Sequence, residues 1–500
     1  MARQPLQVAV IELLCGTDTN SSSYSLFRRQ FFGVMPQSIA AWCRRAGHTV
    51  AYSTYYGQRP VHELIPSSAE VVFISAFTES CALAYCLANL LRRRGVRTIL
   101  GGPHANAFPN DAARFFDVVV KRCDETLIRE CLEETYPRGA ILNSVATTVD
   151  LPSLAERRAD LDRVSLLFGS FSNLSVIPIV SSSGCPYDCD FCVDWDQQYR
   201  LRNADDLQQD FLYASTQMPG RTLAFYDPNF GVNFDKTVGV LEQLDPKSRN
   251  PYIIESSLTV LKESRLARLR DTNCIFIAPG VEAWSGYGRK TGTMTLDASA
   301  KFSRIVEHFA LIGRYVPGLQ ANFLFGSDVD QGEEPVQLTR EFIRRFPNIF
   351  PGIAVPIAFG GIPMREALRQ QQRLLPLPAC YYIDPFPTYR FKHYAMKDFF
   401  RHLIAIYREA AGFKLAVRRM LQPINLPIRL SYLVRIFELR RHIALLEQFS
   451  RVLTHDKEVA AFNNGKSAAI PVYYDWALSL RLGRYAELLP RPDREIATVD

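Results

Sequence analysis

The first 135 residues alternate short apolar runs with stretches in which apolar positions recur every three or four residues. The short runs are typical of buried strands, and the longer periodic stretches are typical of helices. Their alternation predicts βαβ units around a doubly wound parallel sheet, which binds ligands at the carboxyl ends of its strands. The expected strands are residues 7–14, 48–54, 71–77, 97–101 and 117–120, and the expected helices are residues 36–46, 81–94 and a segment from about 125.

A second alternation of strands and helices begins at Val176. Repeated βα units of this length predict a partial (β/α) barrel, whose chemistry should lie at the C-terminal ends of the strands. Carboxylates occur at three of these ends, namely Asp227, Glu255 and Glu282. Each of these carboxylates could bind a ligand, or it could be a salt-bridged residue at a strand end. The expected strands are residues 176–180, 223–226, 252–255, 275–279 and 320–325.

The C-terminal third is predicted to be mainly helical. A helix is expected over residues 396–411, and residues 414–451 carry eight Lys or Arg against two Glu on an amphipathic pattern. This basic helix could lie on an anionic membrane, but we expect it to pack on the barrel. Residues 378–387 are rich in aromatic residues and proline, and they could cap a substrate cavity or form a packed connector. Roughly the last 25 residues are expected to be weakly ordered.

Composition bounds the class of protein without naming it. A chain of 500 residues with 47% hydrophobic content can build a large core divided among several domains. The net charge of +7 is modest, and we expect neither a nucleic-acid partner nor a favoured membrane surface. The sequence shows no signal peptide and no long apolar segment. We therefore expect a reducing, cytoplasmic location. The expected domains are residues 1–140, a linker at 141–172, a barrel at 173–350 and a helical region at 351–500.

The strongest chemical signal is a group of three cysteines within eight residues. Cys185, Cys189 and Cys192 have C-x3-C-x2-C spacing, and they follow the expected strand at residues 176–180. Three thiolates on one loop can hold three irons of a [4Fe–4S] cluster and leave the fourth iron open to a substrate. A structural zinc site would need a fourth ligand nearby, and a disulfide would need an oxidising compartment. We favour the open cluster.

This motif, with an aromatic residue before the last cysteine, resembles that of the radical S-adenosylmethionine (SAM) superfamily. The resemblance implies that the open iron binds SAM, and that one-electron reduction of SAM yields a 5′-deoxyadenosyl radical. It also implies that Asp227, Glu255 and Glu282 contact the amine or the ribose hydroxyls of SAM. Carboxylates suit both groups because they accept charge-assisted hydrogen bonds.

The N-terminal domain resembles the Rossmann-like cobalamin-binding domain that precedes many radical SAM barrels. The similarity lies in the order of the elements and in the loop of residues 101–106, Gly-Gly-Pro-His-Ala-Asn. It implies that the corrin is bordered by Ser75, Thr78, Gly101, Gly102 and His104.

Two departures from the cobalamin-binding pattern are visible. No Asp-x-His sequence supplies an axial histidine, and the loop after the fifth strand is Lys121-Arg-Cys-Asp-Glu125 instead of a glycine-rich acidic loop. An alternative interpretation is therefore a structural α/β domain without a cofactor, in which His104 is a surface loop residue.

The resemblance as a whole implies an α/β protein with a cobalamin-binding-type domain, a partial (β/α)6 radical SAM barrel and a helical C-terminal region. It implies a cobalamin-dependent radical SAM methyltransferase that acts on a natural product, tetrapyrrole or lipid and receives electrons from a flavodoxin or ferredoxin. The alternatives are a non-methylating radical SAM enzyme, which would cyclise, rearrange or oxidise its substrate, and a cluster-bearing sensor or scaffold.

Overall fold

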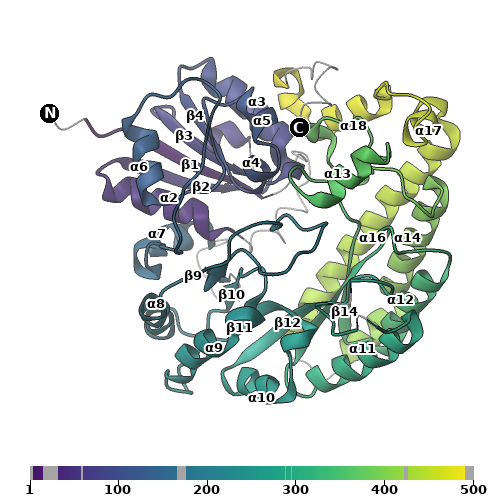
Figure 1. Ribbon diagram of the computed structural model, residues 1–500. Coiled ribbons are helices and arrows are strands. Elements are labelled where there is room, and N and C mark those ends of the chain that lie inside the picture. Colours follow the sequence, from purple (N-terminus) through teal and green to yellow (C-terminus); the bar gives the residue numbers. More distant parts are fainter. Residues whose placement is uncertain are drawn as a thin grey trace.

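The computed structural model describes residues 4–14, 32–57, 60–165, 176–287, 289–293, 295–421 and 426–489. Two parallel β-sheets face each other, and helices from the C-terminal region run along one side of the molecule from the second sheet back to the first (Figure 1). A continuous hydrophobic cluster includes residues of both sheets and of the C-terminal helices. The relative position of the two sheets is therefore fixed by packing.

The first sheet has six parallel strands in the order β2-β1-β3-β4-β5-β6. The five strands expected from the sequence are present, and the doubly wound sheet is confirmed. The sixth strand is a three-residue apolar run that the sequence analysis did not single out, and the expected domain boundary at residue 140 falls at its start. The strands are β1 (Gln7–Leu13), β2 (Thr49–Tyr55), β3 (Val71–Ala76), β4 (Arg97–Gly101), β5 (Val118–Val120) and β6 (Ala140–Leu142).

Helices cover both faces of this sheet. The helix α2 packs on β1, β2 and two further helices, α6 and α7, whereas α3 and α4 pack on β3 and β4. The switch in the direction of winding falls between β1 and β3, where a flavodoxin-like sheet binds its ligand. The helices are α2 (Val34–Arg45), α3 (Cys81–Arg92), α4 (Pro103–Ala107), α5 (Pro109–Ala113), α6 (Glu125–Glu133) and α7 (Leu154–Ser165), with short 3-10 turns η2 (Val61–Leu64) and η3 (Thr78–Ser80).

The segment expected to be a linker contains the helix α7, and its charges are structural. The side chain of Asp160 is buried and accepts two hydrogen bonds of 2.7 Å from Arg44. The neighbouring Glu156 pairs with Arg45 at 2.6 Å. These side chains attach α7, in the segment expected to be a linker, to α2. Residues 166–172 lie outside the described residues.

The second sheet also has six parallel strands, in the order β14-β13-β12-β11-β10-β7. Neighbours in the sheet are successive strands of the chain apart from one short ribbon, β8–β9, so the sheet winds in one direction as a partial barrel. The sixth strand crosses the expected boundary at residue 350. The strands are β7 (Ile177–Ile179), β8 (Ser182–Ser183), β9 (Arg200–Leu201), β10 (Leu223–Phe225), β11 (Tyr252–Ser257), β12 (Cys274–Gly280), β13 (Gly318–Leu324) and β14 (Ile349–Ala354).

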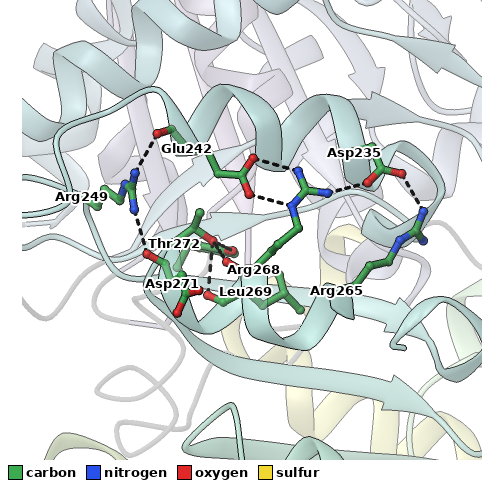
Figure 2. Close-up of polar contacts among 9 residues, drawn as sticks. Asp235, Glu242, Arg249, Arg265, Arg268, Leu269, Asp271 and Thr272 are labelled. Atoms are coloured by element: carbon green, nitrogen blue, oxygen red, sulfur yellow. Dashed lines mark hydrogen bonds and ion pairs between the residues drawn. The ribbon is translucent and has the colours of Figure 1, made fainter. Parts of the chain in front are cut away.

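The outer helices of the barrel are joined by ion pairs at the surface. Arg268 of α10 makes two hydrogen bonds to Glu242 of α9, at 2.7 and 2.9 Å, and one of 2.6 Å to Asp235. Figure 2 shows Arg265 on the other oxygen of Asp235, so the pairs form a network along the two helices. The helices of this part are α8 (Ala204–Gln217), α9 (Phe234–Glu242), α10 (Glu263–Asp271), α11 (Ala298–Ile312) and α12 (Glu334–Arg345), with turns η5 (Phe230–Asn233) and η6 (Leu258–Val260).

The predicted basic stretch is divided between α15 and α16, and α16 packs mainly against α14. Its expected contact with the barrel includes a hydrogen bond of 2.5 Å from Arg435 to Gln320 of β13. Its inward face includes Leu446 and Phe449, whereas Leu433 and Phe437 are exposed. The side chains of residues 426–432, part of the predicted apolar pattern, lie outside the described residues. The helices are α13 (Pro363–Gln370), α14 (Met396–Ala410), α15 (Phe413–Leu421), α16 (Leu426–His455), α17 (Lys457–Asn463) and α18 (Val472–Leu482), with turns η7 (Ala379–Tyr381) and η8 (Gly483–Leu488). No helix in the described parts of the chain is long and apolar enough to cross a membrane.

The last described turn, η8, contacts the first domain. Tyr485 of η8 is buried and lies with its hydroxyl 3.0 Å from Nδ1 of His62, and the carbonyl of Leu488 accepts a hydrogen bond from Asn89. The expected weak order of the last 25 residues is therefore wrong for residues 476–489, and residues 490–500 lie outside the described residues. The aromatic segment 378–387 is a packed connector, since Tyr381 and Tyr382 are buried and η7 contacts α3.

Candidate active site

A cavity of about 620 Å³ lies between the carboxyl ends of the two sheets. Its lining includes the ends of β1, β3, β4 and β5 of the first sheet, the cysteine loop of the second, and residues 360–362. The carboxyl ends of both sheets therefore line the same cavity, and parallel α/β sheets bind ligands at these ends.

The switch point between β1 and β3 opens into this cavity. Glu12 and Ser75 are register partners on the two strands, and both line the space. The Glu12 carboxylate accepts a hydrogen bond of 2.7 Å from the Gly33 amide and one of 3.3 Å from the Tyr52 hydroxyl. Burial raises the pKa of Glu12 to about 7, against the effect of these two hydrogen bonds. The sequence analysis missed this carboxyl because it stands inside an apolar run.

The Gly101-Gly102 turn forms the next part of the wall. Gly102 has a φ of +89°, and a Cβ there would lie 2.9 Å from both the Ser75 hydroxyl oxygen and the Ala76 carbonyl oxygen. Only glycine fits this close approach, and it keeps the wall flat at the end of β4. Of the residues predicted to border a corrin, Ser75, Gly101 and Gly102 line the cavity.

Thr78 and His104 lie behind this wall, and neither is among the residues that line the cavity. His104 is fully buried, with Nε2 2.6 Å from the Tyr85 hydroxyl and Nδ1 3.3 Å from that of Thr78. Burial lowers its pKa to about 3. The alternative of a surface loop histidine is wrong. His104 instead supports the loop that carries Gly102.

Several large apolar side chains are exposed within the cavity. They are Met35, Phe77, Val193 and Tyr226, with 37–51% of their surface accessible. Exposed apolar side chains that share one concave space are typical of a ligand site. The flat glycine wall and these side chains fit the face of a large ring such as a corrin, so the residues present fit the predicted cofactor.

The cysteine loop leaves the second sheet through a narrow base. The ribbon β8–β9 closes the loop on both sides of residues 184–199, with Ser182 paired to Leu201. Gly184 has a φ of +74°, and a Cβ there would lie 2.5 Å from the Gln198 carbonyl oxygen. Glycine is required here because the two ends of the loop touch.

Asp227 anchors this base. Its carboxylate is buried and accepts hydrogen bonds from the Ser181 amide at 2.7 Å, from the Ser181 hydroxyl and from the Ser182 hydroxyl at 2.9 Å. Burial raises the pKa of Asp227, and the hydrogen bonds oppose that rise. Its oxygens face the residues that precede the cysteines, so the structure gives Asp227 a positioning role at the cluster loop.

The three cysteines share one positively charged neighbour. Lys290 interacts electrostatically with the thiols of Cys185, Cys189 and Cys192. Burial raises the pKa of Cys189 and raises that of Cys192 to about 11, while Lys290 acts in the opposite direction on both. A cation beside three thiols favours their thiolate forms, which are the forms that bind iron.

Glu255 and Glu282 both interact electrostatically with the same lysine, Lys290. Burial raises the pKa of both carboxyls, and the charge of Lys290 lowers both. Glu282 has a φ of +62°, a strained conformation for a non-glycine residue that is often found at ligand sites. The structure therefore brings both predicted glutamates to the charged neighbourhood of the cysteines.

The segment of Lys290 also covers the cysteine loop. Tyr287 meets Phe191 edge-on with ring centroids 5.2 Å apart, and Lys290 lies 5.6 Å from the ring centre of Tyr187. The exposed Arg289 pairs with Asp188 at 2.5 Å. The sequence analysis missed this segment because contacts across 100 residues leave no pattern of spacing.

The three thiols are a donor set that suits an iron–sulfur cluster. Among the described residues, no group of three or more His, Cys, Asp or Glu side chains is arranged to hold a single metal ion. A [4Fe–4S] cluster distributes its thiolates over separate irons. None of the described cysteines forms a disulfide, so the three thiols are free to bind iron.

Fold and site together have the organisation expected from the sequence, a doubly wound parallel sheet followed by a partial (β/α) barrel that carries the cysteine loop. The chain is 24% identical over 415 residues to the bacteriochlorophyllide d C-8(2)-methyltransferase of Chlorobaculum tepidum, covering 76% of this chain and 86% of the relative. It is 21% identical over 383 residues to the bacteriochlorophyllide d C-12(1)-methyltransferase of the same organism, covering 74% and 81%. No family model matches the chain.

Two solved structures share the fold. The radical SAM methyltransferase TsrM from Kitasatospora setae, with cobalamin and a [4Fe–4S] cluster bound, gives a TM-score of 0.53 at 13% identity and covers 74% of this chain and 78% of its own. The cobalamin-dependent radical SAM enzyme OxsB, with aqua-cobalamin and SAM bound, gives a TM-score of 0.55 at 11% identity and covers 97% and 84%. The resemblance and the fold class predicted from the sequence are confirmed.

Proposed function

We propose that this protein is a cobalamin-dependent radical SAM methyltransferase that methylates an unactivated carbon of a tetrapyrrole-type substrate. The observation that carries the proposal is one cavity lined both by Gly101 and Gly102 of the first sheet and by residues 182–184 and 193–198, which flank the three cysteines of the second. A methyl carrier and a radical generator must both reach the substrate, and one space between two ligand-binding edges allows this. The two bacteriochlorophyllide methyltransferases support the substrate class.

The roles of the residues follow from their positions. Cys185, Cys189 and Cys192 would hold the [4Fe–4S] cluster, and Asp227 with Gly184 fixes their loop. Glu255, Glu282 and Lys290 would hold the charged amino-acid end and the ribose of SAM. Ser75, Gly101 and Gly102 would border the corrin, while Thr78 and His104 support that wall from behind.

The bound groups supply one-electron reduction of SAM and a transferable methyl group. The chain itself orients them and excludes water. The apolar side chains that face the cavity, such as Phe77 and Tyr226, limit the water around a reactive species. An external electron donor such as a flavodoxin or ferredoxin, and a cytoplasmic location, are part of the same proposal.

An anaerobic assay tests this function. The reconstituted protein is incubated with a bacteriochlorophyllide, reductant and SAM that carries a deuterated methyl group, and the product is analysed by mass spectrometry. A substrate heavier by one labelled methyl group, together with 5′-deoxyadenosine, is expected. Cys189→Ala should lose the cluster absorbance and SAM cleavage together, and intact SAM cleavage in this variant would refute the assigned role.

A second function has one observation in its favour. The cobalamin-dependent radical SAM enzyme OxsB shares the fold over 97% of the chain, and a shared fold does not by itself fix which radical reaction follows. A non-methylating cyclisation, rearrangement or oxidation would give an unlabelled product with free 5′-deoxyadenosine in the same assay. Failure to retain cobalamin on gel filtration would also count against methylation.

A further inference from the structure

Three cationic residues line one part of the cavity, and the proposed function gives them no role. Lys121 and Arg122 follow β5 in the first domain, and Arg200 lies on β9 in the second. All three are partly buried. The loop after β5 is also the place where the sequence departs from the cobalamin-binding pattern, since two cations replace its glycine-rich acidic loop.

The two arginines come from different domains, line the same cavity and repel each other electrostatically. Arg200 donates a hydrogen bond of 3.1 Å from Nη1 to the Ala146 carbonyl, and its Nε is buried with no partner among the described residues. Burial and the like charge of Arg122 lower the pKa of Arg200. Folding thus brings two like charges together in a partly desolvated space, which is unfavourable unless an anion lies between them.

The neighbouring acid does not offset these charges with hydrogen bonds. Asp124 attracts Arg200, but one of its oxygens caps α6 by accepting the Leu127 amide at 2.8 Å, and the other accepts the Ser144 hydroxyl. The other acidic residues that line the cavity are Glu12, Asp150, Asp194 and Asp196. Asp150 follows Val149, whose amide donates to the Leu201 carbonyl, but in the described part of the chain none of these acids forms an ion pair with Lys121, Arg122 or Arg200. Glu12 is bound to the Gly33 amide and Tyr52, and Asp194 lies in the cysteine loop.

We propose that Lys121, Arg122 and Arg200 form an anion subsite that binds a phosphate or carboxylate group across the two domains. Guanidinium groups bind such planar or tetrahedral oxyanions through paired, charge-assisted hydrogen bonds. This inference rests on the proposed function, which offers two sources of the anion. They are the phosphodiester of the cobalamin nucleotide tail and a carboxylate of the tetrapyrrole substrate.

Four ligands separate these sources. Hydroxocobalamin carries the phosphodiester, and cobinamide is the same corrin without it. Pyropheophorbide a carries a free carboxylate, and its methyl ester does not. Each is titrated anaerobically into the full-length, cluster-containing protein and its variants, and binding is followed by absorbance or fluorescence quenching. No turnover is needed.

The variants are Arg122→Gln, Arg200→Gln and both together. Arg200→Lys keeps a charge, and Arg265→Gln removes an exposed arginine from the outer network shown in Figure 2. If the anion is the phosphodiester, the double variant should bind cobalamin roughly 10- to 100-fold more weakly and cobinamide unchanged. If it is the substrate carboxylate, the same loss should fall on pyropheophorbide and spare its ester. Arg200→Lys should recover part of the loss, and Arg265→Gln should bind like the unchanged protein.

Two results would overturn the subsite. One is unchanged affinity of the double variant for all four ligands. The other is an equal loss for each ligand and for its partner without the anion, in a variant with an unchanged circular dichroism spectrum, because such a loss does not depend on the anion. If the unchanged protein binds neither corrinoid, the proposed function fails, but the two chlorins still test the subsite.

Discussion

The Asp227 carboxylate accepts the Ser181 backbone amide at 2.7 Å, and this bond fixes the point at which the cysteine loop leaves the barrel. The same carboxylate also accepts hydrogen bonds from the hydroxyls of Ser181 and Ser182. Replacing Asp227 with Ala leaves buried donors without partners, each at a cost of about 1–3 kcal/mol. We expect Asp227→Ala to fold with a displaced loop and to take up less than half the iron of the unchanged protein.

Iron content after anaerobic reconstitution, together with the absorbance of the cluster, checks this prediction. Asp227→Asn keeps one acceptor for the Ser181 amide and should recover most of the iron. Asp235→Asn changes an exposed carboxylate of the outer network in Figure 2 and should have no effect. Full iron content in Asp227→Ala would show that the loop base does not depend on this carboxylate.

Gly184 gives a second test of the loop base. A methyl group at this position would lie 2.5 Å from the Gln198 carbonyl oxygen, in a backbone conformation with φ of +74°. Gly184→Ala should therefore lower the iron content and destabilise the loop. Gly220 has a φ of +73° but nothing within 4 Å of the added Cβ, so Gly220→Ala suffers the same backbone strain without the contact. Equal iron content in the two variants would contradict the steric argument.

The sequence predicted the parts of the fold that have local patterns. The strands that surround Glu12 and Ser75 were found because buried parallel strands are continuous apolar runs. The cysteine triad was found because its ligands lie within eight residues. In contrast, the side chains of β6 are only half-buried or exposed, so the strand is not a buried apolar run. The helix α7 falls in the segment expected to be a linker, although Asp160 is buried against Arg44.

The parts of the site that depend on tertiary contacts were not predicted. Lys290 follows Cys189 by about 100 residues, and only the closed barrel brings the lysine to the thiols. The buried environment of His104 was also invisible, since its partners Tyr85 and Thr78 belong to another helix and turn. A residue type in a loop shows its chemistry, but its burial depends on the whole fold.

Glu12 makes stability depend on pH. Its pKa is raised from 4.5 to about 7 in the folded protein by burial, so between these values the unfolded chain loses its proton first. The free energy of unfolding should therefore fall as pH rises from about 4.5 to 7, by up to about 3 kcal/mol from this one group. Glu12→Gln retains an acceptor for the Gly33 amide and removes the ionisation.

Urea unfolding of the corrin-free protein at pH 5 and pH 8 measures this effect. The variant should gain stability over the unchanged protein at pH 8, and the difference should be much smaller at pH 5. Glu156→Gln is a suitable contrast, because its pairing with Arg45 lowers the pKa of that carboxyl to about 2 and its contribution is constant between pH 5 and 8. A difference between Glu12→Gln and the unchanged protein that does not vary with pH would disprove the assignment.

Lys290 is the residue whose removal should separate cluster binding from SAM binding. The three thiols that bind iron remain in Lys290→Met, so the iron content should stay above half. The cation that lies beside Glu282 and the cysteines is lost, and with it the proposed partner of the SAM carboxylate. We expect SAM to bind on the order of 10-fold more weakly, the usual effect of one charge-assisted hydrogen bond.

Anaerobic calorimetry of SAM binding to reconstituted protein gives the affinity, and Arg289→Met, which removes an exposed neighbouring charge, is the control. Unchanged SAM affinity in Lys290→Met would remove this lysine from the SAM site and leave it with the thiols alone.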